Sequence, residues 1–193
     1  LQGAFYATTS TTNSPFNYFR EEEKFNYERI LNTVSDEDEN YVLQDNNLIA
    51  IKDSIEFIKN KNPETPTNRI CTSLLLKNRV LKILKYGLVY VTKKEGIEKH
   101  ILRYPQLFAI DNIKKKLDEK IRKGIIWHTQ GSGKTALVYF ALKYLIDYFS
   151  KNKKIVKFYF IVDRIDLLKQ ASREFKSRNL HVNLINSKKD FSH

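Results

Sequence analysis

The expected fold class follows from residues 124–135, which read Gly124-Ile125-Ile126-Trp127-His128-Thr129-Gln130-Gly131-Ser132-Gly133-Lys134-Thr135. Its first four residues form a short apolar run of the kind that makes a buried strand. Its last residues lead into residues 136–148, whose apolar side chains recur on one face of a helix. The stretch therefore predicts a strand, a glycine-rich loop and a helix, in that order.

The loop contains the residue types that bind a polyphosphate. Glycines allow successive backbone N–H groups to point into one concavity, and the start of the following helix adds the positive end of its dipole. Lys134 can reach the β- and γ-phosphates, and the Thr135 hydroxyl is a suitable ligand for Mg²⁺. The strict pattern has glycine six positions before the lysine, where this chain has His128. The alternative to a nucleotide site is a glycine turn that only caps a helix.

A second apolar run and a second helix follow the loop. Residues 158–162 are aromatic or β-branched, as in a strand buried on both faces. Asp163 and Asp166 have capping-box spacing before the next apolar helical face, and residues 180–185 predict a third strand. Strands that alternate with helices form a parallel sheet, so the predicted fold class is α/β, with helices that flank a partial parallel sheet.

The first half of the chain predicts a mixed, mainly helical region with a β-hairpin. The acidic run 35–40 is interpreted as a solvated turn. Apolar patterns predict a short helix within 49–58, a helix over 74–86, a hairpin from 88–91 and 97–102, and a helix over 106–120. We expect three regions, which are an acidic connector that ends an upstream domain (residues 1–66), a helix-plus-hairpin linker (67–104) and the N-terminal part of a P-loop ATPase lobe (105–193).

The composition excludes a membrane protein and a secreted scaffold, and it points to a polyanionic partner. No apolar run approaches the ~20 residues of a membrane span, and the first residues lack the order of a signal peptide. The single cysteine, Cys71, cannot form an intramolecular disulfide, which favours a reducing, cytoplasmic location. Residues 1–66 hold 6 basic and 12 acidic side chains, whereas residues 67–193 hold 28 and 10. A basic second half is typical of nucleic-acid binding, and the alternative is that its lysines only keep the protein in solution.

Three motifs resemble those of one enzyme family. The stretch 124–135 and the run 158–170, which contains Val162-Asp163-Arg164-Ile165-Asp166-Leu167-Leu168-Lys169-Gln170, resemble motifs I and Ia of superfamily-2 helicase motors. More closely, they resemble the R subunit of type I restriction endonucleases, in which Trp-His-Thr precedes the glycine loop. Residues 103–109 (Arg103-Tyr104-Pro105-Gln106-Leu107-Phe108-Ala109) resemble the upstream glutamine motif of that family. The resemblance covers roughly residues 100–180 and implies a RecA-like P-loop sheet.

The resemblance implies a role for each motif. Lys134 would be the catalytic residue and Thr135 the magnesium ligand, while Gln106 would read the adenine edge through its amide. The nucleotide-binding residues would be Gln106, Thr129, Gln130, Gly131, Ser132, Gly133, Lys134 and Thr135, and the DNA-binding residues would be Asp163, Arg164 and Gln170. The implied function is translocation of duplex DNA, driven by ATP and Mg²⁺, before endonucleolytic cleavage. The modification (methyltransferase) and specificity subunits of a restriction complex would be the protein partners.

Other parts of that motor are missing from the sequence. We find no acidic Walker B box, no second RecA-like lobe and no nuclease strand pair, and we interpret three Glu/Asp-x-Lys matches, at 22–24, 118–120 and 174–176, as chance. We therefore expect a piece of a longer chain that is inactive alone and whose parallel sheet is incomplete. Two alternatives stay open, a nucleotide-binding interaction module without hydrolysis of its own and another superfamily-2 DNA helicase.

Overall fold

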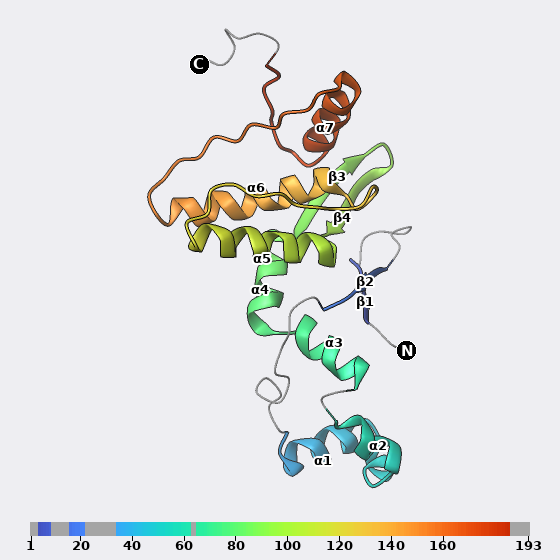
Figure 1. The fold of residues 1–193 in the computed structure, drawn as a ribbon. Coiled ribbons are helices and arrows are strands. Elements are labelled where there is room, and N and C mark those ends of the chain that lie inside the picture. The colour runs from blue at the N-terminus through green and yellow to red at the C-terminus, as the bar shows by residue number, and fades with distance from the viewer. Residues whose placement is uncertain (1–3, 9–15, 22–33, 63–64, 186–193) are drawn as a thin grey trace. The chain divides into compact units, whose positions relative to one another are not determined.

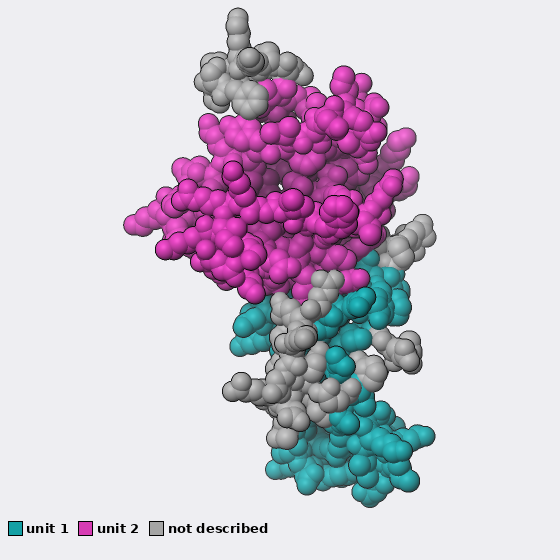
Figure 2. Space-filling view, viewed as in Figure 1, with its two compact units in different colours: residues 1–6, 16–81 teal, residues 7–15, 82–193 magenta. Residues whose placement is uncertain are grey.

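The computed structural model of the 193-residue chain describes residues 4–8, 16–21, 34–62 and 65–185 (Figure 1). The chain divides into two compact units, which Figure 2 shows in different colours. Unit 1 comprises Leu1–Tyr6 and Phe16–Leu81, and unit 2 comprises Ala7–Pro15 and Lys82–His193. The three regions expected from the sequence stay predictions. None of the described helices combines the length and the apolar character that a membrane crossing requires.

Unit 1 contains a small antiparallel sheet and several short helices. Strand β1 (Ala4–Tyr6) pairs with β2 (Asn17–Phe19). The helical segments are α1 (Asp36–Asp45), the 3-10 turn η2 (Ile49–Ile51), α2 (Ile55–Asn60), α3 (Pro66–Leu74) and the first part of α4 (Lys77–Tyr86). The helix predicted over 74–86 corresponds to α4, which begins three residues later, whereas α3 had no counterpart in the sequence prediction.

Two side-chain caps correct the sequence predictions for this unit. The acidic run 35–40 begins a helix instead of forming a turn, because the Ser35 hydroxyl accepts a hydrogen bond from the backbone N–H of Asp38 at 3.1 Å. Acidic side chains also interact favourably with the N-terminus of a helix. The helix predicted within 49–58 is divided at Ser54, whose hydroxyl caps the start of α2.

A buried ion pair joins α4 to the end of β2 in unit 1. The Arg79 guanidinium lies 2.5 Å from the Glu21 carboxylate, and the two side chains are only 6% and 7% exposed. Arg79 also donates to the carbonyl oxygen of Ser73 at 2.9 Å and lies over the ring of Phe19. Because a buried charge is costly without a partner, this cluster holds α4 in place against β2.

Unit 2 packs a hairpin and three helices around a core. Strands β3 (Leu88–Lys93) and β4 (Gly96–Ile101) form the predicted hairpin. Helices α5 (Tyr104–Asp118), α6 (Lys134–Ser150) and α7 (Ile165–Ser177) confirm the three helices predicted there. The core consists mainly of the buried side chains of Val89, Val91, Leu102, Leu107, Phe108, Ile110, Leu137, Phe140, Tyr144 and Phe175.

Helices α5 and α6 lie side by side and run in the same direction (Figure 1). At their starts the side chain of Gln106 contacts the backbone of Gly133, and at their ends the Tyr148 hydroxyl donates to the Asp118 carboxylate at 2.7 Å. The glycine loop therefore lies at the end of the pair where both helices begin. The two C-termini lie together at the other end.

The parallel sheet predicted from the sequence is not formed among the described residues. The runs 124–127, 158–162 and 180–185 have no strand partner there, and both described sheets are two-stranded and antiparallel. Ile125, Trp127 and Ile161 are 90%, 91% and 84% exposed. A strand needs neighbours for its backbone N–H and C=O groups, and no neighbouring strand lies beside these runs in the described part of the chain. The expectation of an incomplete sheet agrees with this arrangement.

Candidate functional site

The glycine loop takes the backbone conformations for which its glycines are needed. Gly131 and Gly133 have φ of +78° and +79°, in the left-handed region that side chains other than glycine rarely adopt. Gly133 is the N-cap of α6, so the turn ends where the helix begins. A Cβ atom on Gly133 would lie 2.8 Å from Nε2 of Gln106. The position therefore requires glycine both for its backbone and for the space beside it.

The start of α6 presents a group of unpaired hydrogen-bond donors. Within the part of the chain that the structure describes, no acceptor pairs with the backbone N–H groups of Gly131, Gly133, Lys134, Thr135 and Ala136. The first intrahelical bond runs from the N–H of Leu137 to the carbonyl oxygen of Gly133 at 2.9 Å. Free N–H groups at a helix N-terminus, together with the helix dipole, make an anion-binding site.

Two buried polar atoms of the loop also lack a partner among the described residues. These atoms are the Ser132 hydroxyl oxygen and Nδ1 of His128. Buried polar groups in proteins are nearly always hydrogen-bonded, so two unpaired polar atoms in one loop indicate a place for a polar ligand. His128 is the residue that departs from the strict loop pattern, and no sequence signal indicated that its Nδ1 would be buried.

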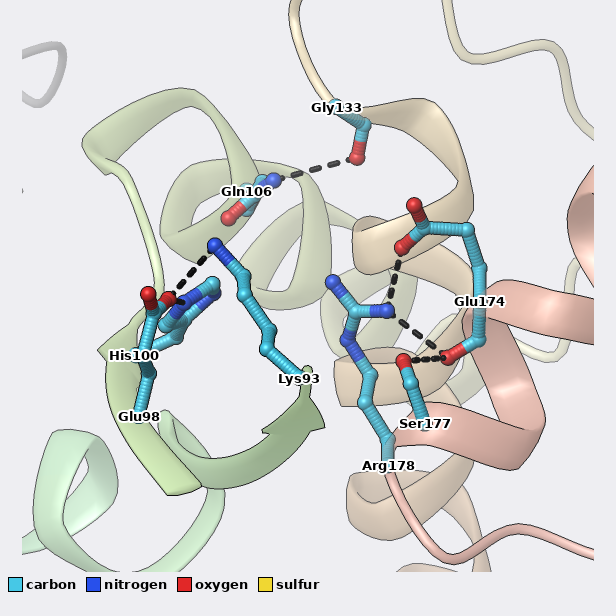
Figure 3. A network of polar contacts seen from close by, with 8 residues as sticks. All are labelled: Lys93, Glu98, His100, Gln106, Gly133, Glu174, Ser177 and Arg178. Carbon is cyan, nitrogen blue, oxygen red and sulfur yellow. Dashed lines mark hydrogen bonds and ion pairs between the residues drawn. The ribbon is translucent and has the colours of Figure 1, made fainter. Parts of the chain in front are cut away.

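Gln106 joins α5 to the glycine loop (Figure 3). Its side chain is 3% exposed, and its Nε2 donates to the carbonyl oxygen of Gly133 at 3.1 Å. Its Oε1 accepts a hydrogen bond from the backbone N–H of Arg103 at 2.8 Å, which caps the start of α5. Its Nε2 also donates to the carbonyl oxygen of Ser132 at 3.5 Å, so one lone pair of Oε1 remains for another partner. The structure thus brings Gln106 to the predicted site, and Arg103, the first residue of the same motif, supports it through its backbone N–H.

Lys134 and Thr135 occupy the first turn of α6. Lys134 is exposed, and its Nζ donates to the carbonyl oxygen of Thr129 at 2.7 Å, across the loop. Thr135 is half-buried beside it. An ammonium group that rests on a backbone carbonyl can exchange it for a phosphate oxygen, which is a stronger, charged acceptor. The loop, Lys134 and Gln106 therefore converge on one place, and Gln130, exposed at the turn, borders it.

The residues predicted to contact DNA lie apart from this group. Asp163, Arg164 and Gln170 are all exposed, at and near the start of α7, and no described contact links them to the glycine loop. The capping prediction for Asp163 is wrong, because the N-cap of α7 is Arg164 and no side chain caps the helix. Asp163 therefore lies one residue outside the helix. An exposed arginine at a helix start is available for a phosphate.

Three ionisable side chains of the hairpin pair among themselves. The Glu98 carboxylate lies 2.7 Å from Nε2 of His100 and 2.6 Å from Nζ of Lys93 (Figure 3). These hydrogen bonds, that of His100 first, hold the pKa of Glu98 below its ordinary value. The described residues contain no group of three or more His, Cys, Asp and Glu side chains that could hold a metal ion. Thr135 therefore remains the one residue that we predict from the sequence to be a magnesium ligand.

Comparison with known proteins places this site in a family context. Residues 99–191 match the family model described as type III restriction enzyme, res subunit. A protein of Methanocaldococcus jannaschii named as a type I restriction enzyme endonuclease subunit is 42% identical over 106 residues, which cover 50% of this chain and 10% of that protein. Type I restriction enzyme endonuclease subunits of Staphylococcus aureus and Staphylococcus saprophyticus are 36% and 38% identical over 74 residues, which cover 38% of this chain and 8% of each.

The matched segment includes all three motifs that carry the resemblance. The chain spans only about a tenth of the length of the curated relatives that it matches. No solved structure matches it significantly. Over residues 99–191 the sequence is similar to restriction-enzyme subunits, and the predicted resemblance to the R subunits of type I restriction endonucleases is confirmed.

Proposed function

We propose that the loop 129–135 binds ATP with Mg²⁺ and that the chain is part of the DNA-translocating R subunit of a type I restriction enzyme. The observation that carries this proposal is the group of unpaired N–H donors at the start of α6, beside the Lys134 ammonium. A triphosphate offers many charged acceptor oxygens, and such a group of donors suits it better than any neutral ligand.

Each residue of the site has a group available for the nucleotide. Lys134 would leave the Thr129 carbonyl for the β- and γ-phosphates, and the Thr135 hydroxyl would hold Mg²⁺. Gln106 would read the adenine edge through its amide, by giving up the long 3.5 Å bond from its Nε2 to the carbonyl oxygen of Ser132. Bound ATP supplies the hydrolysis whose free energy drives movement along DNA. The orphaned Ser132 hydroxyl would gain a partner in the same cradle.

DNA and the other subunits complete the proposal. Arg164 would contact a backbone phosphate, with Asp163 and Gln170 beside it on the exposed start of α7. The unpaired runs 124–127 and 158–162 would pair with further strands of the R subunit to complete a RecA-like sheet. Modification and specificity subunits would supply the DNA target, and the enzyme would work in the cytoplasm.

Equilibrium titration of the chain with a fluorescent ATP analogue and Mg²⁺ tests the nucleotide site. We expect Lys134→Ala to weaken binding by about tenfold or more, because it removes a charge-assisted hydrogen bond to phosphate. Its thermal unfolding should be unchanged, since Lys134 is exposed. Lys94→Ala, an exposed lysine in the turn of the hairpin, is the matched control and should bind as the unaltered chain does.

A second measurement separates the motor from the alternatives. In the complete R subunit, Lys134→Ala should abolish ATP hydrolysis stimulated by duplex DNA. If the analogue binds equally well to the Lys134→Ala chain, the loop is only a helix-capping turn. If the complete protein binds ATP but DNA never stimulates its hydrolysis, the chain belongs to an interaction module instead.

A further inference from the structure

The C-terminal ends of α5 and α6 carry a dense cluster of basic side chains. Residues 114–123 and 151–157 together hold ten lysines and arginines against two acidic residues. Within residues 114–123 and 151–154, some exposed basic side chains form no described ion pair. We call them the terminal basic cluster, and they are Lys115, Lys120, Arg122, Lys123, Lys153 and Lys154. The acidic side chains nearby are already neutralised, because Asp118 pairs with Lys114 and Glu119 with Lys116.

The packing of the two helices brings the two parts of this cluster together. The bond between the Tyr148 hydroxyl and Asp118 holds the last turns of α5 and α6 side by side. The residues that follow each last turn therefore share one end of the helix pair, on the left of Figure 1. This end is opposite to the glycine loop, so the terminal basic cluster is a separate surface from the nucleotide site.

Two lysines of the cluster occupy backbone positions that disfavour lysine. Lys120 and Lys153 have φ of +61° and +55°, and each terminates its helix in the left-handed position that glycine or asparagine usually fills. In both cases the next residue bonds back to a carbonyl oxygen of the last turn, from Ile121 to Lys116 at 2.9 Å and from Lys154 to Phe149 at 3.1 Å. This backbone strain occurs just after the C-terminus of each of two neighbouring helices. It indicates that the positive charges of Lys120 and Lys153 have a function.

The chemistry of the cluster favours nucleic acid over protein. Protein interfaces are poor in lysine and have an apolar centre, whereas surfaces that bind DNA are polar and strongly positive. The cluster contains five lysines and one arginine, and their flexible ammonium groups suit the phosphates of a duplex, which carry one charge per about 1.7 Å of helix axis.

We propose that the terminal basic cluster binds the phosphate backbone of duplex DNA, as a second contact at the end of the lobe opposite to the glycine loop. This contact is independent of nucleotide and of DNA sequence. It shares with the proposed function only the ligand, duplex DNA, and it needs neither ATP nor Lys134.

Nucleotide-free titration of the chain with a 30-base-pair duplex tests the contact. The variant Lys120→Gly/Lys153→Gly removes two charges and at the same time allows the left-handed backbone, so its thermal midpoint should not fall. Its affinity for the duplex should fall about tenfold or more, and the slope of log affinity against log salt should decrease by about 1.8, or about 0.9 for each lost phosphate contact. Loss of binding without loss of stability cannot come from misfolding.

Two further variants and one competing ligand complete the design. Lys120→Arg/Lys153→Arg keeps the charge and should keep the affinity, and Lys94→Gln, which removes a charge from the hairpin turn, should change it by less than about twofold. Equal affinity and an equal salt slope for the double glycine variant would overturn the proposal. The proposal would also be overturned if the double glycine variant lost affinity for a poly-glutamate peptide but kept its affinity for the duplex. The partner of the cluster would then be an acidic protein. These DNA-binding results do not depend on whether the unaltered chain binds the ATP analogue, so the two proposals can fail independently.

Discussion

The side-chain amide of Gln106 donates to the carbonyl oxygen of Gly133 at 3.1 Å and so joins the start of α5 to the start of α6. The same amide accepts from the backbone N–H of Arg103 at 2.8 Å. One end of the buried amide thus caps α5, and the other end holds the glycine loop. The loop is set in position by the protein itself, before any ligand binds.

Gly133→Ala should destabilise the protein and abolish binding of the ATP analogue. The alanine would adopt φ of +79°, which costs about 1 kcal/mol, and its Cβ would lie 2.8 Å from Nε2 of Gln106. We expect a total loss of about 2 kcal/mol in the free energy of unfolding, measured in urea. Gly124→Ala is the matched control, because nothing lies within 4 Å of its Cβ position, and it should change stability by less than about 0.5 kcal/mol. Equal stabilities for the two variants would contradict the geometry of the loop.

Gln106→Glu should lower the free energy of unfolding, although the two side chains have the same shape. It places a carboxylate oxygen against the carbonyl oxygen of Gly133, where the structure has a donor. An unpaired buried polar group costs about 1–3 kcal/mol, so we expect a loss of that size in chemical denaturation. The same change at the exposed Gln44 of α1 should have an effect of less than about 0.5 kcal/mol. A fully stable Gln106→Glu variant would show that the amide does not hold the loop.

Amide hydrogen exchange should distinguish residues 124–128 sharply from α6. These residues form no strand and are mostly exposed, so their N–H groups should exchange rapidly, whereas those of residues 137–148 within α6 should be protected. Trp127 is the single tryptophan of the chain and is 91% exposed, so acrylamide should quench its fluorescence efficiently. Strong and uniform protection of residues 124–128 would mean that the strand pairs within this chain after all.

The stability contributed by Asp147 should depend on pH in the acidic range. Hydrogen bonds from Tyr86 and Lys85, and a weaker one from Lys151, lower the pKa of Asp147 from 3.8 to about 2. Because the folded-state pKa is the lower one, the carboxylate stabilises the protein above about pH 4, and this contribution is lost as the pH falls towards 2. We expect Asp147→Asn to cost about 1 kcal/mol at pH 7, after allowance for solvent screening.

The pH dependence itself supplies the check on Asp147. The difference in unfolding free energy between the unaltered chain and Asp147→Asn should shrink between pH 4 and pH 2 and be nearly absent at the lower value. Asp53→Asn, at an exposed carboxylate of unit 1, should show no such trend. A difference that stays constant down to pH 2 would mean that packing around Asp147, and not its charge, is responsible.

Short-range sequence patterns were enough to predict the helices and the hairpin of unit 2, but not the pairing of its apolar runs. The hairpin, α5, α6, α7 and the glycine loop follow from apolar periodicity and from the positions of glycine, because these features depend on interactions within a few residues. The same local patterns indicated the resemblance to restriction-enzyme subunits, which the comparisons confirm over residues 99–191. Short-range reasoning failed where capping decides the outcome, as at Ser35, Ser54 and Arg164, since several neighbouring residues can each serve as a cap.

The arrangement of the glycine loop and of the apolar runs depends on contacts between residues far apart in the sequence. The bond between Gln106 and Gly133 spans 27 positions of sequence and exists because α5 packs against α6. The run 124–127 is strand-like in composition but stays unpaired, because a strand is stabilised by hydrogen bonds to a neighbouring strand and not by its own sequence. That residues 120 and 153 lie at the same end of the helix pair likewise depends on the side-by-side packing of two helices, which no local pattern encodes.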